Sequence, residues 1–597
     1  MADDVHIKKR VMVIQVFLVG TLLLLGAKSF DIQIRKADLY ARRAENGYSR
    51  LLTIKGERGQ ILDRNLNKLG TSLDAMTIIA DPQRIEAPVK IARILAKHLE
   101  IDSKTLTGKF SADNRYTVLS EAVTPELADD IRKLHLPGIY FKKSFKRFYP
   151  NRDLAAQVIG FTGKNDVGRE GLEFKYNTIL EGREFAVTVR KDGVGRVLDI
   201  DKKTQDDLRG NTIVLTLDKK IQFLSETALE QAVKEHQAKS GLALVMRPVT
   251  GEILAIAHYP RFNPNNYQDF SDIPYRNRAV TDAFEPGSAM KVFTAAAALE
   301  KGFTPSSIFF CENGKYRIGR YVVNDTHPHD WLSIDQIITY SSNIGAVKIS
   351  ETIGRQALHA CLTRFGFGTR TRVESPGETS GTLTSPDQWS DIDAGAISFG
   401  QGVSVSAIQL ISGISAIANN GQLMKPMLVK KILSNTGKTV QVFSPTLVRQ
   451  AVSPLVAAQV RHMMRLAVQE KGTGTKANLT GYAVCGKTGT AQKVAAGQKQ
   501  YAKNKYMSVF AGFAPEKNPR LAILVVVDEP QKKYYGGDVA APAFKTIMAQ
   551  SCNYLSIPPV TASLVAAVPH KVTAGFHKTA TKGLDAKTPA NTLKGAL

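Results

Sequence analysis

The stretch Glu285-Pro-Gly-Ser-Ala-Met-Lys291 carries the strongest signal in this 597-residue sequence. A proline and a glycine mark a chain turn before Ser288, residues 289–300 are rich in alanine, and Gly302 follows as a stop. This pattern predicts a helix that begins near Ser288. Because residues three apart share a helix face, Ser288 and Lys291 should lie side by side.

That pair is suited to nucleophilic catalysis. A serine hydroxyl attacks a carbonyl only when a base accepts its proton, and lysine is a base only when it is neutral. Neutrality at physiological pH requires lowering the lysine pKa from about 10.4 to about 7–8, and both burial and a second nearby cation act in that direction. Taken alone, Ser288 is equally well explained as a helix cap, so the other two motifs decide whether it is catalytic.

A second motif, Ser341-Ser-Asn343, follows the first along the chain. We expect Ser341 to relay a proton to the leaving amine of a cleaved peptide, and Asn343 to hold Lys291 and a substrate amide. The alternative is a polar turn between two helices.

The third motif is Lys487-Thr-Gly-Thr490, which the sequence predicts to lie on an edge strand lining a cleft. Lys487, Thr488 and Thr490 would bind a substrate carboxylate, and Lys487 could also supply the second cation. Gly489 would let the backbone approach the substrate closely. The backbone N–H groups of Ser288 and Thr490 would form an oxyanion hole.

Charge and composition narrow the partners. The net charge of +25 and the pI near 9.7 favour anionic partners, such as a membrane surface or a cell-wall polymer. Without zinc-finger spacing or a basic-aromatic module, nucleic acid is not favoured. No nucleotide fingerprint occurs, so no cofactor is expected. His327-Pro-His329-Asp330 offers too few ligands for zinc, so we expect a polar loop there and no metal site.

The N-terminus predicts a membrane anchor. Three basic residues, Lys8-Lys-Arg10, precede an apolar run over residues 11–27 that extends to 32. The pattern favours an uncleaved signal anchor over 11–32, with residues 1–10 in the cytoplasm and the remainder outside it. The alternative is a cleaved signal peptide, for which Leu25-Gly-Ala27 offers only a weak cleavage site. Residues 31–50 are compatible with a helical stalk.

The rest of the chain predicts three parts. Residues 33–215 mix short apolar runs with charged segments, and a strand flanked by turns is expected within 56–65. From 216 to 557 helices alternate with strands, which indicates an α+β fold with helices packed on an antiparallel sheet. Residues 558–597 predict a disordered basic tail, either inert or in contact with wall polymer. Further expected elements are a strand over 212–217, a helix over 219–237, a hairpin of 241–246 with 252–257, and a β-rich stretch over 507–527.

The four cysteines, Cys311, Cys361, Cys485 and Cys552, form no disulfide framework by spacing, and whether any of them pair stays open. Cys485 is expected to be a packed core thiol.

The motifs together resemble a known family. The three motifs, in this order, are typical of penicillin-binding proteins and class A β-lactamases. Arg58-Gly-Gln-Ile-Leu-Asp-Arg-Asn65 is similar to the R-G-x-I-x-D-R-N box of class B penicillin-binding proteins, although the family usually continues N-G-x-x-L-A where this chain has Asn65-Leu-Asn-Lys-Leu-Gly. Further matching segments are Gly168-Arg-Glu-Gly-Leu-Glu173 with Tyr176-Asn177, Phe399-Gly-Gln-Gly402 with Gln409-Leu410, Gly472-Thr-Gly474, and Tyr534-Tyr-Gly-Gly537 with Ala541-Pro542.

The resemblance implies a single-pass protein of the bacterial inner membrane, with an irregular α/β pedestal domain over 33–215 and a transpeptidase domain over 216–557. It implies a peptidoglycan D,D-transpeptidase in which Ser288 attacks the D-Ala-D-Ala bond of a stem peptide, and which β-lactams acylate at the same serine. Ser-Ser-Asn in the central motif fits the division type. The implied partners are lipid-linked precursor and peptidoglycan stem peptides, an FtsW-type membrane glycosyltransferase and other divisome membrane proteins.

Other functions remain open at this stage. An elongation-type transpeptidase would use the same residues, and a D,D-carboxypeptidase or β-lactamase would use water as the acceptor. No E-x-x-L-N segment, which gives class A β-lactamases their deacylating glutamate, lies between Asn343 and Lys487, so slow hydrolysis is expected. A catalytically silent septal scaffold or β-lactam sensor is the non-enzymatic alternative. The acceptor amine, the stem composition and the oligomeric state are not determined by the sequence.

Overall fold

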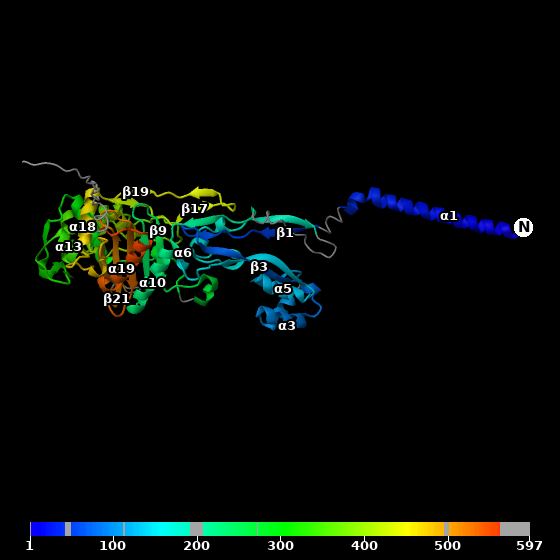
Figure 1. The fold of residues 1–597 in the computed structure, drawn as a ribbon, viewed down its shortest axis with the longest axis horizontal. Helices are drawn as coiled ribbons and strands as arrows, with labels where there is room; N and C mark the ends of the chain where they lie inside the picture. Colours follow the sequence, from blue (N-terminus) through cyan, green and yellow to red (C-terminus); the bar gives the residue numbers. More distant parts are fainter. Residues whose placement is uncertain are drawn as a thin grey trace, which may run out of the picture.

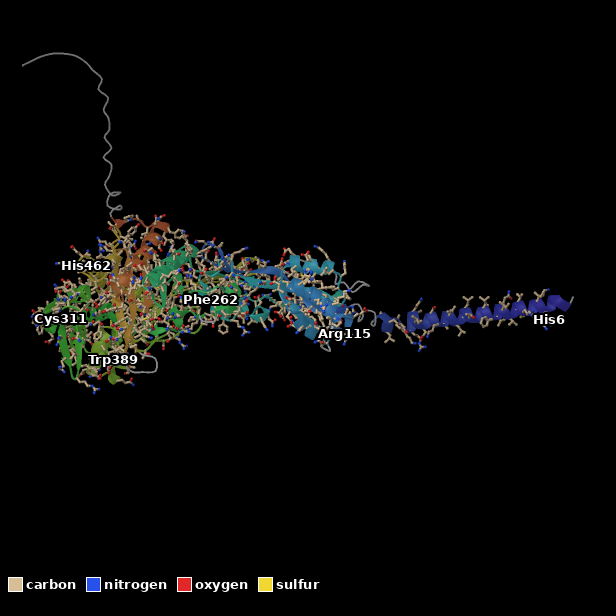
Figure 2. The ribbon with its side chains drawn as sticks, turned by 90° about the horizontal axis from the view of Figure 1, so that it is seen from below. His6, Arg115, Phe262, Cys311, Trp389 and His462 are labelled. Carbon is tan, nitrogen blue, oxygen red and sulfur yellow. The ribbon has the colours of Figure 1, made fainter. Side chains whose placement is uncertain are left out.

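The computed structural model describes residues 2–41, 49–111, 114–190, 207–270, 273–494 and 501–560. Its parts follow one another along an elongated molecule: a projecting N-terminal helix, a middle region and a larger domain at the far end (Figure 1). In Figure 2, Arg115 marks the middle region, Cys311, Trp389 and His462 lie in the far domain, and Phe262 lies between them.

The N-terminal helix agrees with the predicted anchor. Helix α1 (Ala2–Phe30) continues into the π-helical turn η1 (Asp31–Arg35), and the stretch His6–Arg35 is long and apolar enough to cross a membrane. Within the described part of the predicted stalk over 31–50, residues 37–41 are helical and Arg50 lies in strand β1 (Ser49–Lys55). The predicted tail lies outside the described residues from 561 onward.

A five-stranded antiparallel sheet forms the centre of the far domain, in the order β20-β21-β22-β8-β9. Both of its faces are buried, and successive residues of β8 contribute to opposite cores, Leu244 to one and Val245 to the other. The expected hairpin, helix and strand are confirmed, since β8 pairs with β9, helix α10 covers the second face with α19, and β7 begins at Thr212. The elements are β8 (Ser240–Met246), β9 (Ile253–Tyr259), β20 (Cys485–Val494), β21 (Tyr501–Ala514), β22 (Leu521–Asp528), α10 (Lys219–Glu235) and α19 (Gly536–Tyr554).

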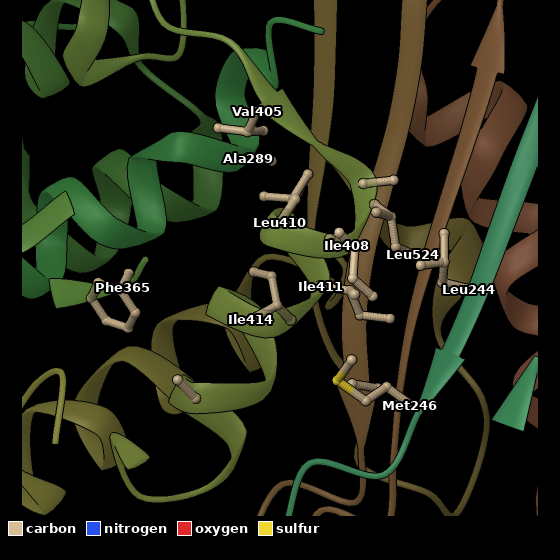
Figure 3. Packing of buried hydrophobic residues seen from close by; sticks show 14 of the residues in the cluster. Leu244, Met246, Ala289, Phe365, Val405, Ile408, Leu410, Ile411, Ile414 and Leu524 are labelled. Carbon is tan, nitrogen blue, oxygen red and sulfur yellow. The ribbon is translucent and has the colours of Figure 1, made fainter. Parts of the chain in front are cut away.

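Helix α17 (Ala407–Ala418) lies at the centre of the far domain, and every residue in it is buried. Figure 3 shows Ile408 and Ile411 facing the sheet at Leu524, while Leu410 lies beside Ala289. This apolar helix therefore packs between the sheet and the chain segment that follows Ser288, and fixes the position of that segment. The surrounding helices are α12 (Lys291–Glu300), α13 (Ile334–Tyr340), α14 (Asn343–Ile353), α15 (Arg355–Arg364), α16 (Asp391–Ser398) and α18 (Pro454–Leu466).

The middle region, which we call the pedestal, is built on a seven-stranded sheet. The strand expected within 56–65 is only the two-residue β2, and the long strand β3 runs beside it. Two strands of this sheet, β17 and β18, come from the later part of the chain, which the sequence analysis did not predict. The sheet thereby joins the pedestal to the far domain. Its strands are β2 (Ile61–Leu62), β3 (Lys68–Ala80), β4 (Thr117–Val123), β5 (Ile139–Phe148), β7 (Thr212–Leu215), β17 (Val429–Leu433) and β18 (Thr439–Val442), and α3 (Pro88–Leu99), α4 (Ser103–Phe110) and α5 (Pro125–Lys133) pack on β3 and β4 through one apolar cluster.

Two segments that resemble the family meet in a buried charge cluster. Glu173 is fully buried and pairs with Arg58 at 2.7 Å and with Arg147 at 2.6 Å. Arg58 also donates to the side chain of Asn177 at 2.9 Å. Buried charges are tolerated only when they are paired in this way, so the cluster holds together segments more than 100 residues apart in sequence.

We expect Glu173→Gln to destabilise the pedestal by about 3–5 kcal/mol, because two buried guanidinium groups lose their counter-charge. Urea unfolding followed by tryptic cleavage of the pedestal measures this change. Asp130→Asn, which removes an exposed ion pair with Lys133, is the matched control and should leave the unfolding midpoint unchanged. Equal midpoints for both variants would contradict a structural role for the cluster.

Candidate active site

The nucleophile segment agrees with the predicted helix start. Ser288 lies in the 3₁₀ turn η5 (Gly287–Met290) that leads into α12, and Lys291 is the first residue of that α-helix. Ser288 is half-buried, whereas Lys291 is completely buried. The serine is therefore open to a ligand while the amine beneath it is excluded from water.

The predicted edge strand is also found, and its glycine lies against the turn that contains Ser288. Strand β20 is the outer strand of the sheet and carries Lys487, Thr488 and Thr490. A Cβ at Gly489 would lie 2.6 Å from the carbonyl oxygen of Pro286, which a real side chain cannot do. The glycine therefore admits the backbone that precedes the nucleophile, and no contact with substrate is needed to explain it.

Gly287 has the reciprocal constraint. Its φ of +54° lies in the left-handed region, and a Cβ there would meet the Thr490 carbonyl oxygen at 2.8 Å. The nucleophile turn and the edge strand thus touch through backbone on both sides.

The Lys291 amine is held by two residues from the second motif. Its Nζ donates to the Ser341 carbonyl oxygen at 2.5 Å and to Asn343 Oδ1 at 2.7 Å, and it lies 3.3 Å from Ser341 Oγ. A neutral amine has two protons and one lone pair. Because two oxygens that only accept take both protons, the lone pair stays available to a hydroxyl.

The Ser341 hydroxyl connects the two lysines. Lys487 is completely buried, and its Nζ donates to Ser341 Oγ at 2.8 Å. Ser341 adopts a left-handed backbone conformation, with φ 63° and ψ 40°, at the end of α13. That uncommon geometry turns the chain between α13 and α14, so that the carbonyl and the hydroxyl of Ser341 both reach Lys291.

Burial controls the protonation of both amines. It lowers the pKa of Lys291 to about 7, against the opposing attraction of the Asp325 carboxylate. Burial, followed by repulsion from Lys291, lowers the pKa of Lys487 well below its usual value. Burial therefore lowers the pKa of Lys291 as expected, whereas the repulsion between the two amines lowers the pKa of Lys487 and is not among the causes for Lys291.

Asp325 is a site residue that the sequence analysis missed. Its carboxylate accepts from Ser342 Oγ and from the Asn343 backbone N–H, both at 2.5 Å, and from the Ile344 N–H at 3.1 Å. It thereby caps α14 and fixes the turn that presents Ser341 and Asn343. No local signal marks this role, because the partners lie at least 17 positions away.

Thr473 is a second missed residue. Its hydroxyl lies 2.8 Å from that of Thr488, and the Thr490 hydroxyl accepts from the Gly536 N–H at 3.0 Å. Both threonines of the third motif are therefore oriented by neighbours. Thr473 and Gly536 fall in segments that the sequence analysis noted only as family resemblances.

The histidine loop has a structural explanation. His329 stacks on Tyr340 with ring centroids 5.1 Å apart, and within the described ranges no group of three or more His, Cys, Asp or Glu side chains could hold a metal ion. The four cysteines are buried free thiols, and Cys485 is a core residue as predicted, with burial raising the pKa of its thiol.

Comparison with known proteins agrees with this geometry. Residues 53–215 match the family model of the penicillin-binding protein dimerisation domain, and residues 241–549 match that of the penicillin-binding protein transpeptidase domain. The fold and the site therefore define a penicillin-binding protein.

Relatives refine this assignment. The chain is 34% identical over 548 residues to a protein of Neisseria meningitidis described as the probable peptidoglycan D,D-transpeptidase PenA, covering 91% of this chain and 92% of that one. It is 33% identical over 551 residues to the peptidoglycan D,D-transpeptidase FtsI of Escherichia coli, covering 91% and 90%. The crystal structure of penicillin-binding protein 3 from Mycobacterium tuberculosis, complexed with aztreonam, superposes with a TM-score of 0.67 at 28% identity and covers 85% of this chain and 98% of that one. The chain belongs to the class B penicillin-binding proteins of the FtsI and PenA type, and is a peptidoglycan D,D-transpeptidase.

The pKa of Lys291 predicts a pH dependence. If Lys291 is the base that accepts the Ser288 proton, only its neutral amine can do so, and acylation by a penicillin should be slow below the pKa and rise with pH through a midpoint near 7. Below the midpoint, each pH unit should change the second-order rate constant by about tenfold. Stopped-flow acylation with a chromogenic cephalosporin measures this profile, and a rate independent of pH would contradict a neutral lysine as the base.

Asp325→Asn should shift that profile. Removing the carboxylate removes the charge that stabilises protonated Lys291, so the midpoint should move to lower pH. The acylation rate on the alkaline plateau should also fall, because the cap of α14 is weakened. Asp330→Asn, in the same loop but exposed, should reproduce the wild-type profile. An unchanged midpoint in Asp325→Asn would show that the carboxylate does not act on Lys291.

Proposed function

We propose that the reaction proceeds through an acyl-enzyme at Ser288, with Lys291 as the base. The observation that carries this proposal is that one hydroxyl, Ser341 Oγ, lies 2.8 Å from Lys487 Nζ and 3.3 Å from Lys291 Nζ, with both amines excluded from water. In this arrangement the Ser341 hydroxyl can accept a proton from one amine and donate its own proton to another group, so it can act as a proton relay.

In the first half-reaction, Ser288 Oγ attacks the carbonyl carbon of the penultimate D-alanine of a stem peptide. The serine proton passes to Lys291, and the backbone N–H groups of Ser288 and Thr490 stabilise the oxyanion. Ser341 relays the proton to the leaving amine, which departs as D-alanine and leaves an ester on Ser288. Thr488 and Thr490 bind the substrate carboxylate, and Lys487 polarises Ser341 through its hydrogen bond to Ser341 Oγ.

In the second half-reaction, an amine of a neighbouring stem attacks the ester. Its proton returns through Lys291 to the Ser288 oxygen, and a new peptide bond cross-links the two strands. A β-lactam would acylate Ser288 in the same way but present no leaving group that diffuses away.

We further propose a septal role. The supporting points are the likeness to FtsI over nearly the whole chain and the single apolar helix at the N-terminus. The domain from 216 to 557 would then lie on the outer side of the inner membrane, with residues 1–10 in the cytoplasm. An FtsW-type glycosyltransferase would contact the anchor at 11–32 and the pedestal at 33–215.

Ser288→Ala should abolish labelling by a fluorescent penicillin and abolish release of D-alanine from a stem pentapeptide, because it removes the hydroxyl on which the proposed ester forms. Ser551→Ala is the matched control, since Ser551-Cys-Asn553 imitates the second motif but lies buried in α19. Labelling that persists in Ser288→Ala would refute the assigned nucleophile. Hydrolysis products alone in the wild type, despite an added amine acceptor, would favour a carboxypeptidase.

Depletion of the protein in its own cells distinguishes the physiological roles. Filaments are expected for a septal enzyme, whereas rounded cells would assign it to elongation. Normal division supported by Ser288→Ala would favour a catalytically silent scaffold.

A further inference from the structure

A second cleft, of about 640 Å³, lies at the junction of the pedestal and the far domain. Its walls include β5 of the pedestal, the loop around Asp166, and Tyr267 from the far domain. No residue of the three catalytic motifs lines it. Its size is within the range typical of ligand sites.

The cleft contains buried polar groups that lack partners. Ser144 Oγ, Arg147 Nη2 and Asp166 Oδ1 all belong to lining residues, and none of these atoms has a hydrogen-bond partner. Arg147 is only 7% exposed. These three atoms are themselves fully buried behind the cleft surface, so the groups that an occupant can reach are the exposed lysines and the exposed ring of Tyr116.

The cleft is also basic and aromatic. Lys142 and Lys146 are exposed and share a face of β5 with Ser144, because they alternate along the strand. Lys55, Lys143 and Lys164 add further positive charge, against three lining carboxylates at Glu121, Asp166 and Glu184. The rings of Tyr116, Phe145, Tyr149 and Tyr267 complete the lining.

We propose that this cleft binds a length of peptidoglycan glycan strand that carries anionic stem peptides, an inference that rests on the proposed function. The exposed ring of Tyr116 suits the apolar face of a sugar, whereas Tyr149 is buried and Tyr267 already stacks on Phe161. The stem carboxylates pair with the lysines. An acidic segment of a protein partner would meet the same lysines but would offer no sugar face to the exposed ring of Tyr116.

Binding in this cleft would supply stem peptides to the catalytic site. The substrate is a polymer, so the strand extends beyond the peptide that enters the catalytic site. Residues of both the pedestal and the far domain line the cleft, and the far domain also carries Ser288. Holding the strand raises the effective concentration of its stem peptides at the catalytic site.

The test uses full-length protein in detergent, first acylated with penicillin so that the catalytic site is blocked. The probes are soluble uncross-linked glycan strands with their stem peptides, the same strands after amidase removal of the peptides, and an oligoglutamate. The variants are Lys142→Glu with Lys146→Glu, and Tyr116→Ala, whose side chain is 54% exposed. The control is Lys97→Glu with Lys104→Glu, two exposed lysines of the pedestal outside the cleft lining.

We expect the wild type to bind peptide-bearing strands, and the cleft double variant to raise their Kd about tenfold or more, while the control double variant changes it little. Tyr116→Ala should weaken the binding of strands with and without stem peptides. Removal of the stem peptides by amidase should weaken the binding of strands to the wild type. All variants should keep the wild-type rate of penicillin acylation, which reports the catalytic site separately from the cleft.

The proposal is overturned if the wild type does not bind the strands, or if the control variant weakens binding as much as the cleft variant. It is also overturned if oligoglutamate binds more tightly than the strands and competes with them, because the cleft would then serve an acidic protein segment. Loss of acylation in the wild type would instead refute the proposed function.

Discussion

The site depends on the burial of two amines that meet at one hydroxyl. Two charged ammonium groups without solvent cannot both persist within reach of one serine side chain, so the fold forces the loss of a proton from at least one of them. Lys291 and Lys487 come from a helix and from an edge strand, and Ser341 comes from the junction between two other helices. The helix, the edge strand and the helix junction must be positioned accurately before burial can lower the pKa of the two lysines.

The placement is achieved by close backbone contact. Gly287 and Gly489 let the nucleophile turn and the edge strand touch without side chains between them. Behind this contact, α17 fills the space between the sheet and the segment after Ser288 with fully buried apolar residues. An interior packed in this way deforms little, so the two amines stay near the hydroxyl.

The pedestal handles buried charge in the opposite way. Glu173 pairs with both Arg58 and Arg147 out of contact with water, so the buried charges offset one another. In the pedestal this pairing joins distant segments, whereas at the active site burial lowers the pKa of both lysines. The carboxylate of Asp325 moderates this effect and orders the turn that holds the shared hydroxyl.

Local spacing and hydrophobic period encode the three motifs and their order, the helix that begins near Ser288, the edge strand, the apolar N-terminal helix and the α+β class. They do not encode the role of Asp325, the contact of Gly489 with the turn before Ser288, or the pairing of β17 with β7, which joins residues more than 200 positions apart. Those features depend on which surfaces meet when the chain is packed, and a linear pattern does not contain that information. The tertiary structure also decided the protonation of Lys291, since its low pKa is a consequence of burial and not of its sequence neighbours.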